Sequence, residues 1–249
     1  MPVTTERRGR VLIARLERPE KRNAMNREMT LGLDAAMNKL EEDPELWVGI
    51  LAGAEGVFSA GSDLKDGLNN STERGGPYGV VRRARVKPLI AAVDGFAFGG
   101  GFEMVLACDL VVASRAASFA LPEVKRGVFA LYGGPHRAAH ALPLNVAREL
   151  ALTGDALSAE RAERFGLVNV LCEPGRAVEQ ALALAARICA NSPISVRESL
   201  RAINAPLEAG DALAWEIAAD ASKRVRASED TREGVAAFFE KRKPEWKGR

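Results

Sequence analysis

Apolar residues in the first two thirds of the chain fall into short runs of the length expected for β-strands. Residues 10–17 (RVLIARLE) alternate between apolar and polar positions, and Arg18-Pro19 ends this run. Continuous apolar runs, typical of buried strands, occupy residues 47–53, 89–94 and 109–113. This pattern predicts an α/β fold for this part of the chain.

Helical periodicity is clearest after the first strand. Asn26 is a typical capping residue, and apolar side chains follow it at helical spacing at Met29, Leu33, Ala36, Met37 and Leu40. Two further helices are expected over residues 80–86 and 100–107, each followed by a strand. Strands and helices therefore alternate, as they do in a sheet covered by helices.

The last third of the chain is predicted to be mainly helical. Ser158 caps a helix that Gly166 ends, and a short strand follows at residues 168–171. Three more helices are expected: one over residues 177–190, one opened by Ser192-Pro193 and one capped by Ser228. We predict a catalytic domain over residues 1–190 and a helical C-terminal region over residues 191–249.

Composition and charge narrow the function classes. Of 249 residues 47% are hydrophobic, which allows a sizeable core, and the net charge of +2 excludes a strongly basic nucleic-acid binder. The three cysteines are widely spaced and form no CxxC pair. The chain has neither a signal-peptide pattern nor an apolar run that could span a membrane, so a cytoplasmic protein without a membrane partner is expected.

Two glycine-containing turns follow predicted strands, at residues 58–64 (FSAGSDL) and 95–103 (GFAFGGGFE). Consecutive glycines at a helix start expose backbone N–H groups that suit an anion or a developing oxyanion. Plain tight turns are the alternative explanation. The spacing matches neither the GxGxxG dinucleotide motif nor a phosphate-binding loop ending in Gly-Lys-Ser/Thr.

Two carboxylates lie in apolar surroundings. Glu103 is in the first turn of a predicted helix, where it could simply complement the helix dipole. Glu123 follows the apolar run Phe-Ala-Leu-Pro, where an acid is costly unless it is paired, functional or exposed. Asp94 and Asp109 at strand ends are expected to be structural.

The same segments carry a family resemblance. They are RPEKRNAM at residues 18–25, FSAGSDLK at 58–65, KPLIAAVDG at 87–95, GGGFE at 99–103 and FALPE at 119–123. In this order, and over nearly the whole chain, the sequence resembles the enoyl-CoA hydratase/isomerase (crotonase) family. The resemblance implies a spiral of ββα units and a helical C-terminal region that forms a homotrimer or a dimer of trimers.

The resemblance also implies the chemistry. Two backbone N–H groups, which fall on Ala60 and Gly100, are expected to polarise the carbonyl of an acyl-CoA thioester. Glu103 and Glu123 fall on the two glutamate positions of the hydratases, where one carboxylate activates water and the other exchanges a proton at C2. Which glutamate does which stays open. No cofactor or metal is expected, coenzyme A being part of the substrate.

Further contacts with the acyl-CoA follow by position. The expected residues are Arg22, Ala24, Ser59, Ser62, Asp63, Leu64, Gly99 and Tyr132. Segment 127–134 departs from the family pattern, and its Phe129, Leu131 and Tyr132 are either acyl-pocket walls or plain core. Enoyl-CoA isomerisation and non-catalytic binding of a CoA ester remain alternatives to hydration.

Two groups of polar residues have weaker functional readings. His136 and His140 have metal-ligand spacing but lack a third ligand nearby, so we expect them on or near a helix surface. The basic run Arg82, Arg83, Arg85 and Lys87 is expected to be an exposed helix face, or else to attract the CoA phosphates.

Overall fold

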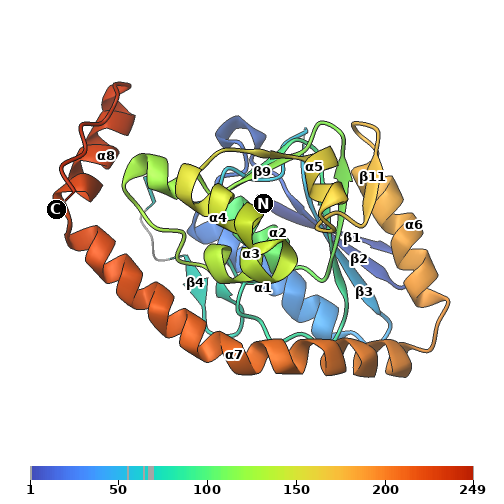
Figure 1. Cartoon of the computed structure of the whole chain (residues 1–249). Helices are drawn as coiled ribbons and strands as arrows, with labels where there is room; N and C mark the ends of the chain where they lie inside the picture. Colours follow the sequence, from blue (N-terminus) through green and yellow to red (C-terminus); the bar gives the residue numbers. More distant parts are fainter. Residues whose placement is uncertain (1, 55, 64, 67–69, 249) are drawn as a thin grey trace.

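The computed structural model describes residues 2–54, 56–63, 65–66 and 70–248, and it is built on a six-stranded sheet (Figure 1). Its strand order is β1-β2-β3-β6-β8-β11. The strands are β1 (Val3–Arg8), β2 (Val11–Leu16), β3 (Val48–Gly53), β6 (Leu89–Val93), β8 (Leu110–Ser114) and β11 (Val170–Cys172). All pairs are parallel except β1 with β2. The α/β fold is confirmed, although the last strand begins two residues later than expected.

A smaller sheet stands beside the first and sets the path of the chain. It has the order β10-β9-β7, formed by β7 (Phe96–Phe98), β9 (Ser118–Ala120) and β10 (Leu157–Ser158). The chain runs from β6 to β7 to α2 (Gly100–Leu106), and then from β8 to β9 to the 3₁₀ helix η2 (Pro122–Arg126). Successive ββα turns therefore bring the starts of α2 and η2 together, where the Gly99 N–H donates to the Ala120 carbonyl at 2.9 Å.

Helices cover both faces of the large sheet, as parallel strands require. Ala177, Ala181 and Ala185 of α6 (Ala177–Cys189) pack on one face against strand residues such as Ile13 and Ile50. The opposite face packs against three helices, α1 (Arg27–Glu42), α3 (Gly134–Ala141) and α4 (Leu144–Thr153), together with α2. The small alanines let α6 approach the sheet closely.

The expected helix caps are present. Asn26 Oδ1 accepts from Met29 N at 2.9 Å at the start of α1. Ser158, Ser192 and Ser228 accept in the same way at α5 (Ala159–Arg164), α7 (Pro193–Ala227) and α8 (Glu229–Glu240). Each cap satisfies a backbone N–H that has no partner within the helix.

The helix predicted over residues 80–86 is wrong. The segment instead follows a small hairpin of β4 (Ser71–Thr72) and β5 (Gly76–Pro77) and forms turns. Directly before the segment, Tyr78 and Gly79 both have positive φ, 54° and 76°, so no right-handed helix enters it from the hairpin. The Arg83 guanidinium fixes the turn by donating to the Gly79 carbonyl and pairing with Asp34.

The basic run is not an exposed helix face either, although Arg82 is exposed as expected. Arg83 and Lys87 are buried, and the Lys87 ammonium donates to the carbonyls of Leu40 and Asp43, both at 2.7 Å. Arg85 forms a two-pronged ion pair with Asp109, whose Oδ2 also accepts from Leu89 N at 2.8 Å. These cations are therefore part of the scaffold. The structural role predicted for Asp109 is confirmed.

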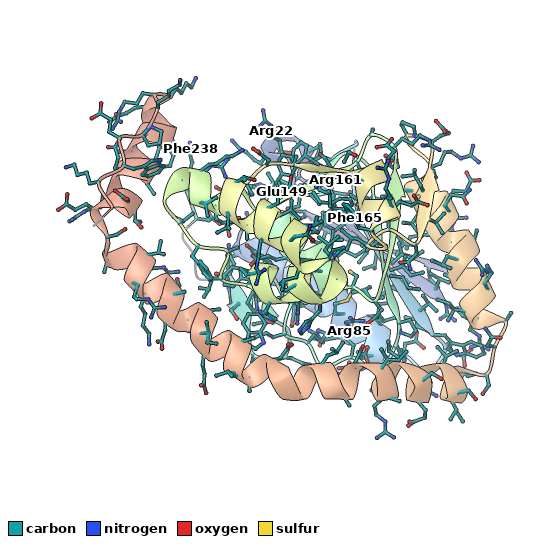
Figure 2. All side chains as sticks on the ribbon, viewed as in Figure 1. Arg22, Arg85, Glu149, Arg161, Phe165 and Phe238 are labelled. Carbon is teal, nitrogen blue, oxygen red and sulfur yellow. The ribbon has the colours of Figure 1, made fainter. Side chains whose placement is uncertain are left out.

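The C-terminal helices form an arm around the body. α7 crosses beneath it from the end of α6, and α8 lies at the far end of the molecule, where Figure 2 labels Phe238 (Figures 1 and 2). Large apolar side chains are exposed along this arm at Ile194, Ile203, Leu207, Leu213, Ile217, Phe238 and Phe239. α7 begins at Pro193, and the domain boundary at residue 190 stays a prediction.

The structure also bears on membrane association. None of the helices in the described part of the chain combines the length and apolar character that crossing a membrane requires. The cytoplasmic location stays a prediction.

The Arg85–Asp109 pair yields a test of the scaffold. Asp109→Ala leaves a guanidinium that is only 8% exposed without its counter-charge, so we expect a loss of about 3–5 kcal/mol in the free energy of unfolding. Urea denaturation measures it. The control Glu149→Ala breaks the geometrically similar but exposed pair with Arg161 (Figure 2) and is expected to cost far less. Equal losses of unfolding free energy in the two variants would contradict the conclusion that the buried pair is part of the scaffold.

Candidate active site

Two loops that are distant in sequence are fastened together at one edge of the small sheet. Met25 bridges to Ser62, and Arg18 forms a 2.8 Å ion pair with Asp63 and donates to the Ala24 carbonyl at 3.0 Å. The loop that carries Arg22 and Ala24 is thereby held against residues 59–63, as expected for one binding site. Arg22 itself is exposed (Figure 2).

Some predicted contacts in these loops prove to be internal. Ser59 is completely buried; its hydroxyl donates to the Asn23 carbonyl at 2.8 Å and accepts from Gly61 N at 3.1 Å. The Ser59 hydroxyl is therefore not available to a substrate, and a contact through the rest of this residue stays a prediction. The Asp63 carboxylate is held by Arg18 and by Lys65 N, so its visible role is to brace the loops. Leu64 lies outside the described residues.

The first turn of α2 supplies free backbone donors. Its N–H groups have no partners within the helix, and Gly100 is its first residue. The segment 59–62 reaches this turn, since a Cβ on Gly61 would lie only 2.8 Å from the Gly100 nitrogen. The position predicted for Gly100 as an oxyanion donor agrees with this geometry.

The second predicted donor, Ala60, is contradicted. Its N–H donates to the Arg22 carbonyl at 3.0 Å and is already paired. Met25 instead bonds to the Gly61 carbonyl and the Asp63 N–H, so the Ser62 N–H between them points to the other side. No acceptor for it lies among the described residues. The position in the motif could not distinguish the Ala60 N–H from the Ser62 N–H, because the difference lies in which of them is paired with a neighbouring segment.

Glu103 is fixed deep in the site. It is 2% exposed, and its Oε1 accepts from Gly134 N at 3.0 Å, at the start of α3. Burial raises the pKa of this carboxyl well above its ordinary value, and the nearby Glu123 carboxylate raises it further. The hydrogen bond from Gly134 opposes this shift without cancelling it. Glu103 is therefore suited to hold a proton at neutral pH.

Glu123 faces the same turn from η2. A Cβ on Gly99 would lie 2.8 Å from its Oε1, so only glycine leaves room for the carboxylate there. Burial raises the pKa of Glu123 as well. Its Oε2 is shielded from solvent and has no hydrogen-bond partner in the part of the chain that the structure describes. A buried carboxylate oxygen without a partner is poised to bind a donor such as water.

A tyrosine that sequence reasoning missed lies between these groups. Tyr78 is almost fully buried, and its hydroxyl is 2.6 Å from Ser62 Oγ. Its ring meets that of Tyr132 edge to face, with 5.2 Å between centroids. The chain has only these two tyrosines, and both are here. The predicted position of Tyr132 at the site agrees with this arrangement.

The long helix α7 supports the loop before α3. Trp215 packs on Gly133, where a Cβ would lie 3.1 Å from the indole ring, and it stacks under the guanidinium of Arg82 at 3.8 Å. His136 meets Trp215 edge to face at 5.0 Å and is half-buried, while His140 is exposed on the same helix, so both lie on or near a helix surface as expected. Among the described residues, no group of three His, Cys, Asp or Glu side chains could hold a metal ion.

Comparisons with known proteins show which family the chain belongs to. The family model for enoyl-CoA hydratase/isomerase matches residues 6–249. Mevalonyl-coenzyme A hydratase of Aspergillus fumigatus is 39% identical over 95% of this chain and 91% of its own. Short-chain-enoyl-CoA hydratase of Clostridium acetobutylicum is 34% identical over 98% and 96%. Among solved structures, carnitinyl-CoA hydratase of Mycobacterium avium superimposes with a TM-score of 0.96 at 42% identity, covering 100% and 99%.

The fold and the match over almost the whole chain define a crotonase-fold protein. The chain belongs to the enoyl-CoA hydratase/isomerase family. Members of this family act on acyl-CoA thioesters, and the chain is an enzyme of the hydratase type.

The raised pKa of Glu103 leads to a pH-dependent stability. The pKa of Glu103 in the folded protein exceeds the ordinary value of 4.5. The contribution of this carboxyl to stability is therefore fully present below pH 4.5, and it is lost as the pH rises through the folded pKa. The Glu103→Gln side chain stays neutral at every pH. The free energy of unfolding of this variant should exceed that of the wild type by at least ~1 kcal/mol at about pH 8. The difference should vanish towards about pH 4.5, where both side chains are neutral.

Urea denaturation of both proteins over this pH range measures the difference. Groups other than Glu103 titrate in both proteins, so their effects largely cancel. A difference that does not change with pH would contradict the raised pKa.

Proposed function

We propose that the protein is an enoyl-CoA hydratase, which adds water reversibly across the double bond of a 2-enoyl-CoA thioester. The observation that carries this proposal is the pair of carboxylates that face the start of α2, the buried Glu103 on α2 and the half-buried Glu123 on η2. Both have raised pKa values, and a general acid or base works best with a pKa near the working pH. The hydratases among its relatives support the same chemistry.

The backbone at α2 supplies the electrostatic part of the mechanism. Negative charge develops on the thioester oxygen when water attacks C3, and fixed N–H donors stabilise it. We propose Gly100 and Ser62 as these donors, in place of Gly100 and Ala60, because the Ala60 N–H is already paired. Each such donor contributes roughly 3–4 kcal/mol in comparable oxyanion sites.

The two carboxylates divide the proton transfers. One accepts a proton from the attacking water, and the other delivers a proton to C2 of the enolate; the reverse reaction exchanges these roles. The unpaired Oε2 of Glu123 is open to a bound water, whereas Glu103 Oε1 is held by Gly134. The carboxylates and N–H donors cover every charge and proton in this scheme, so we propose that it needs no metal or redox cofactor.

Isomerisation of an enoyl-CoA is the second candidate within the family, whose model covers both activities. It moves a proton between two carbons and can run with a single carboxylate. Two carboxylates at one site favour hydration, and they also argue against a non-catalytic CoA-ester-binding protein. The acyl group is not specified by the glutamates.

Replacement of each glutamate tests the proposal. Glu103→Gln and Glu123→Gln keep the side-chain size but remove the exchangeable proton, so each should lower turnover of the best 2-enoyl-CoA by at least ~10²-fold. The loss of turnover in the double variant should be much smaller than the product of the two single losses, because the two groups act in one step. The assay follows the absorbance of the conjugated thioester in excess EDTA.

Labelled water separates the alternatives. Hydration by the wild type in ¹⁸O water places the label in the product, whereas isomerisation does not. Near-normal turnover of either variant, or an unlabelled product, would remove the hydratase assignment and leave the family assignment intact.

We further propose that the protein is a homotrimer or a dimer of trimers assembled through its C-terminal arm. The exposed apolar side chains of α7 and α8, among them Leu213 and Phe239, need a covering surface in water. Light scattering at micromolar concentration should give a mass at least three times that of the chain. Leu213→Glu should shift the mass towards the monomer, while the exposed polar control Lys223→Glu should not. A monomeric wild type would overturn this proposal.

A further inference from the structure

Tyr78 is aimed into the site by an unusual backbone. It follows Pro77 at the end of β5 and has a φ of 54°, a conformation uncommon for residues other than glycine. Its neighbour Gly79 also has a positive φ, and a Cβ there would lie 2.7 Å from the Thr30 carbonyl on α1. The turn is therefore packed tightly against α1, and it holds a large polar side chain in the interior.

The hydroxyl of Tyr78 ends at the proposed oxyanion site. It lies 2.6 Å from Ser62 Oγ. It also lies against the first residue of α2, since a Cβ on Gly100 would be only 2.1 Å from the phenolic oxygen. The phenol thus contacts both residues whose N–H groups are the proposed donors. A thioester oxygen bound by these N–H groups comes to lie beside it.

The electrostatic surroundings keep this hydroxyl protonated. Burial raises the pKa of Tyr78 well above its ordinary value, and the charges of Glu103 and Glu123 add to the shift. Between the two hydroxyls of Tyr78 and Ser62 there are two protons, and their mutual hydrogen bond uses one of them. The other proton remains available to a bound acceptor.

We propose that Tyr78 is a catalytic residue, whose phenolic O–H is a third hydrogen-bond donor to the thioester oxygen of the substrate. The inference rests on the proposed hydratase function. Ser62 has two parts in this proposal: its N–H is a direct donor, and its hydroxyl donates to the Tyr78 oxygen, which orients the phenol and leaves the phenolic O–H for the substrate. Tyr132 supports the phenol ring from the side.

Tyr78→Phe is the matched variant, because it keeps the ring and its contact with Tyr132 and removes only the hydroxyl. We expect kcat to fall roughly 10- to 100-fold, the loss typical of one hydrogen bond to a developing charge, with KM changing much less. Ser62→Ala keeps the backbone donor and removes only the orienting hydroxyl, so its loss should be smaller. The two losses should not multiply in the double variant, since both act through one hydrogen-bonded pair.

A measurement on a bound ligand makes the test independent of turnover. Butanoyl-CoA labelled with ¹³C at the thioester carbon has no double bond to hydrate, and its carbonyl stretching band reports the donors on its oxygen. In the wild type this band should shift to lower frequency on binding, and in Tyr78→Phe the shift should be smaller. Should Tyr78→Phe fail to fold, 3,5-difluorotyrosine at position 78 is a more acidic donor of similar shape and should enlarge the shift.

The outcomes distinguish the two proposals. Equal bands and equal kcat in wild type and Tyr78→Phe would overturn the role of Tyr78 while leaving hydration intact. A band shift that depends on Tyr78 in a protein that hydrates no 2-enoyl-CoA would support the third donor and remove the proposed function. Tighter binding of butanoyl-CoA to Tyr78→Phe, with an unchanged band, would mean that the phenol merely fills the site, and the inference would fail.

Discussion

The close approach of the α2 start to segment 59–62 is the constraint on which the site depends. A Cβ on Gly101 would lie 2.3 Å from the Ser59 carbonyl oxygen, and one on Gly100 would meet the Tyr78 hydroxyl. A side chain at position 101 would force the two backbones apart, and one at position 100 would displace the Tyr78 ring. Glycine permits this close approach, and the N–H groups that we propose as donors come from the two segments that it brings together; such preorganised donors need no rearrangement during reaction.

The rest of the molecule must hold Glu103 and Glu123 in surroundings that disfavour a charged carboxylate. Burial penalises the charged forms of Glu103 and Glu123, and a site with raised pKa values is a source of instability that the scaffold must offset. The buried ion pair of Arg85 with Asp109 and the Lys87 contacts with backbone carbonyls tie the strands and turns behind the site into a fixed framework. Rigid surroundings keep each carboxyl in one orientation, as acid–base catalysis requires.

The C-terminal arm contacts η2, which bears Glu123, and the loop before α3, whose first residue holds Glu103. On α8, Thr231 Oγ1 donates to the Gly127 carbonyl at 2.7 Å, directly after η2, which carries Glu123. A Cβ on Gly234 would lie 2.3 Å from the Arg126 carbonyl, so α8 packs there without an intervening side chain. On α7, Trp215 packs on Gly133, next to the Gly134 N–H that holds Glu103. The arm, whose apolar surface we assign to assembly, therefore also contacts the segments that support Glu103 and Glu123.

The sequence by itself determined the class of fold and most helix starts, and it singled out Glu103 and Glu123 as candidate residues of one site. Strand runs, capping residues such as Asn26 and Ser158, and the glycine run before Glu103 are local signals, because each depends on neighbouring residues in the chain. Only the tertiary structure decided which backbone N–H is free, since the pairing of Ala60 with Arg22 joins segments far apart in sequence. The tertiary structure also showed that Arg83 and Arg85, expected on an exposed helix face, form ion pairs with Asp34 and Asp109. It placed Tyr78 against Ser62 and Gly100, a contact that no local sequence pattern encodes.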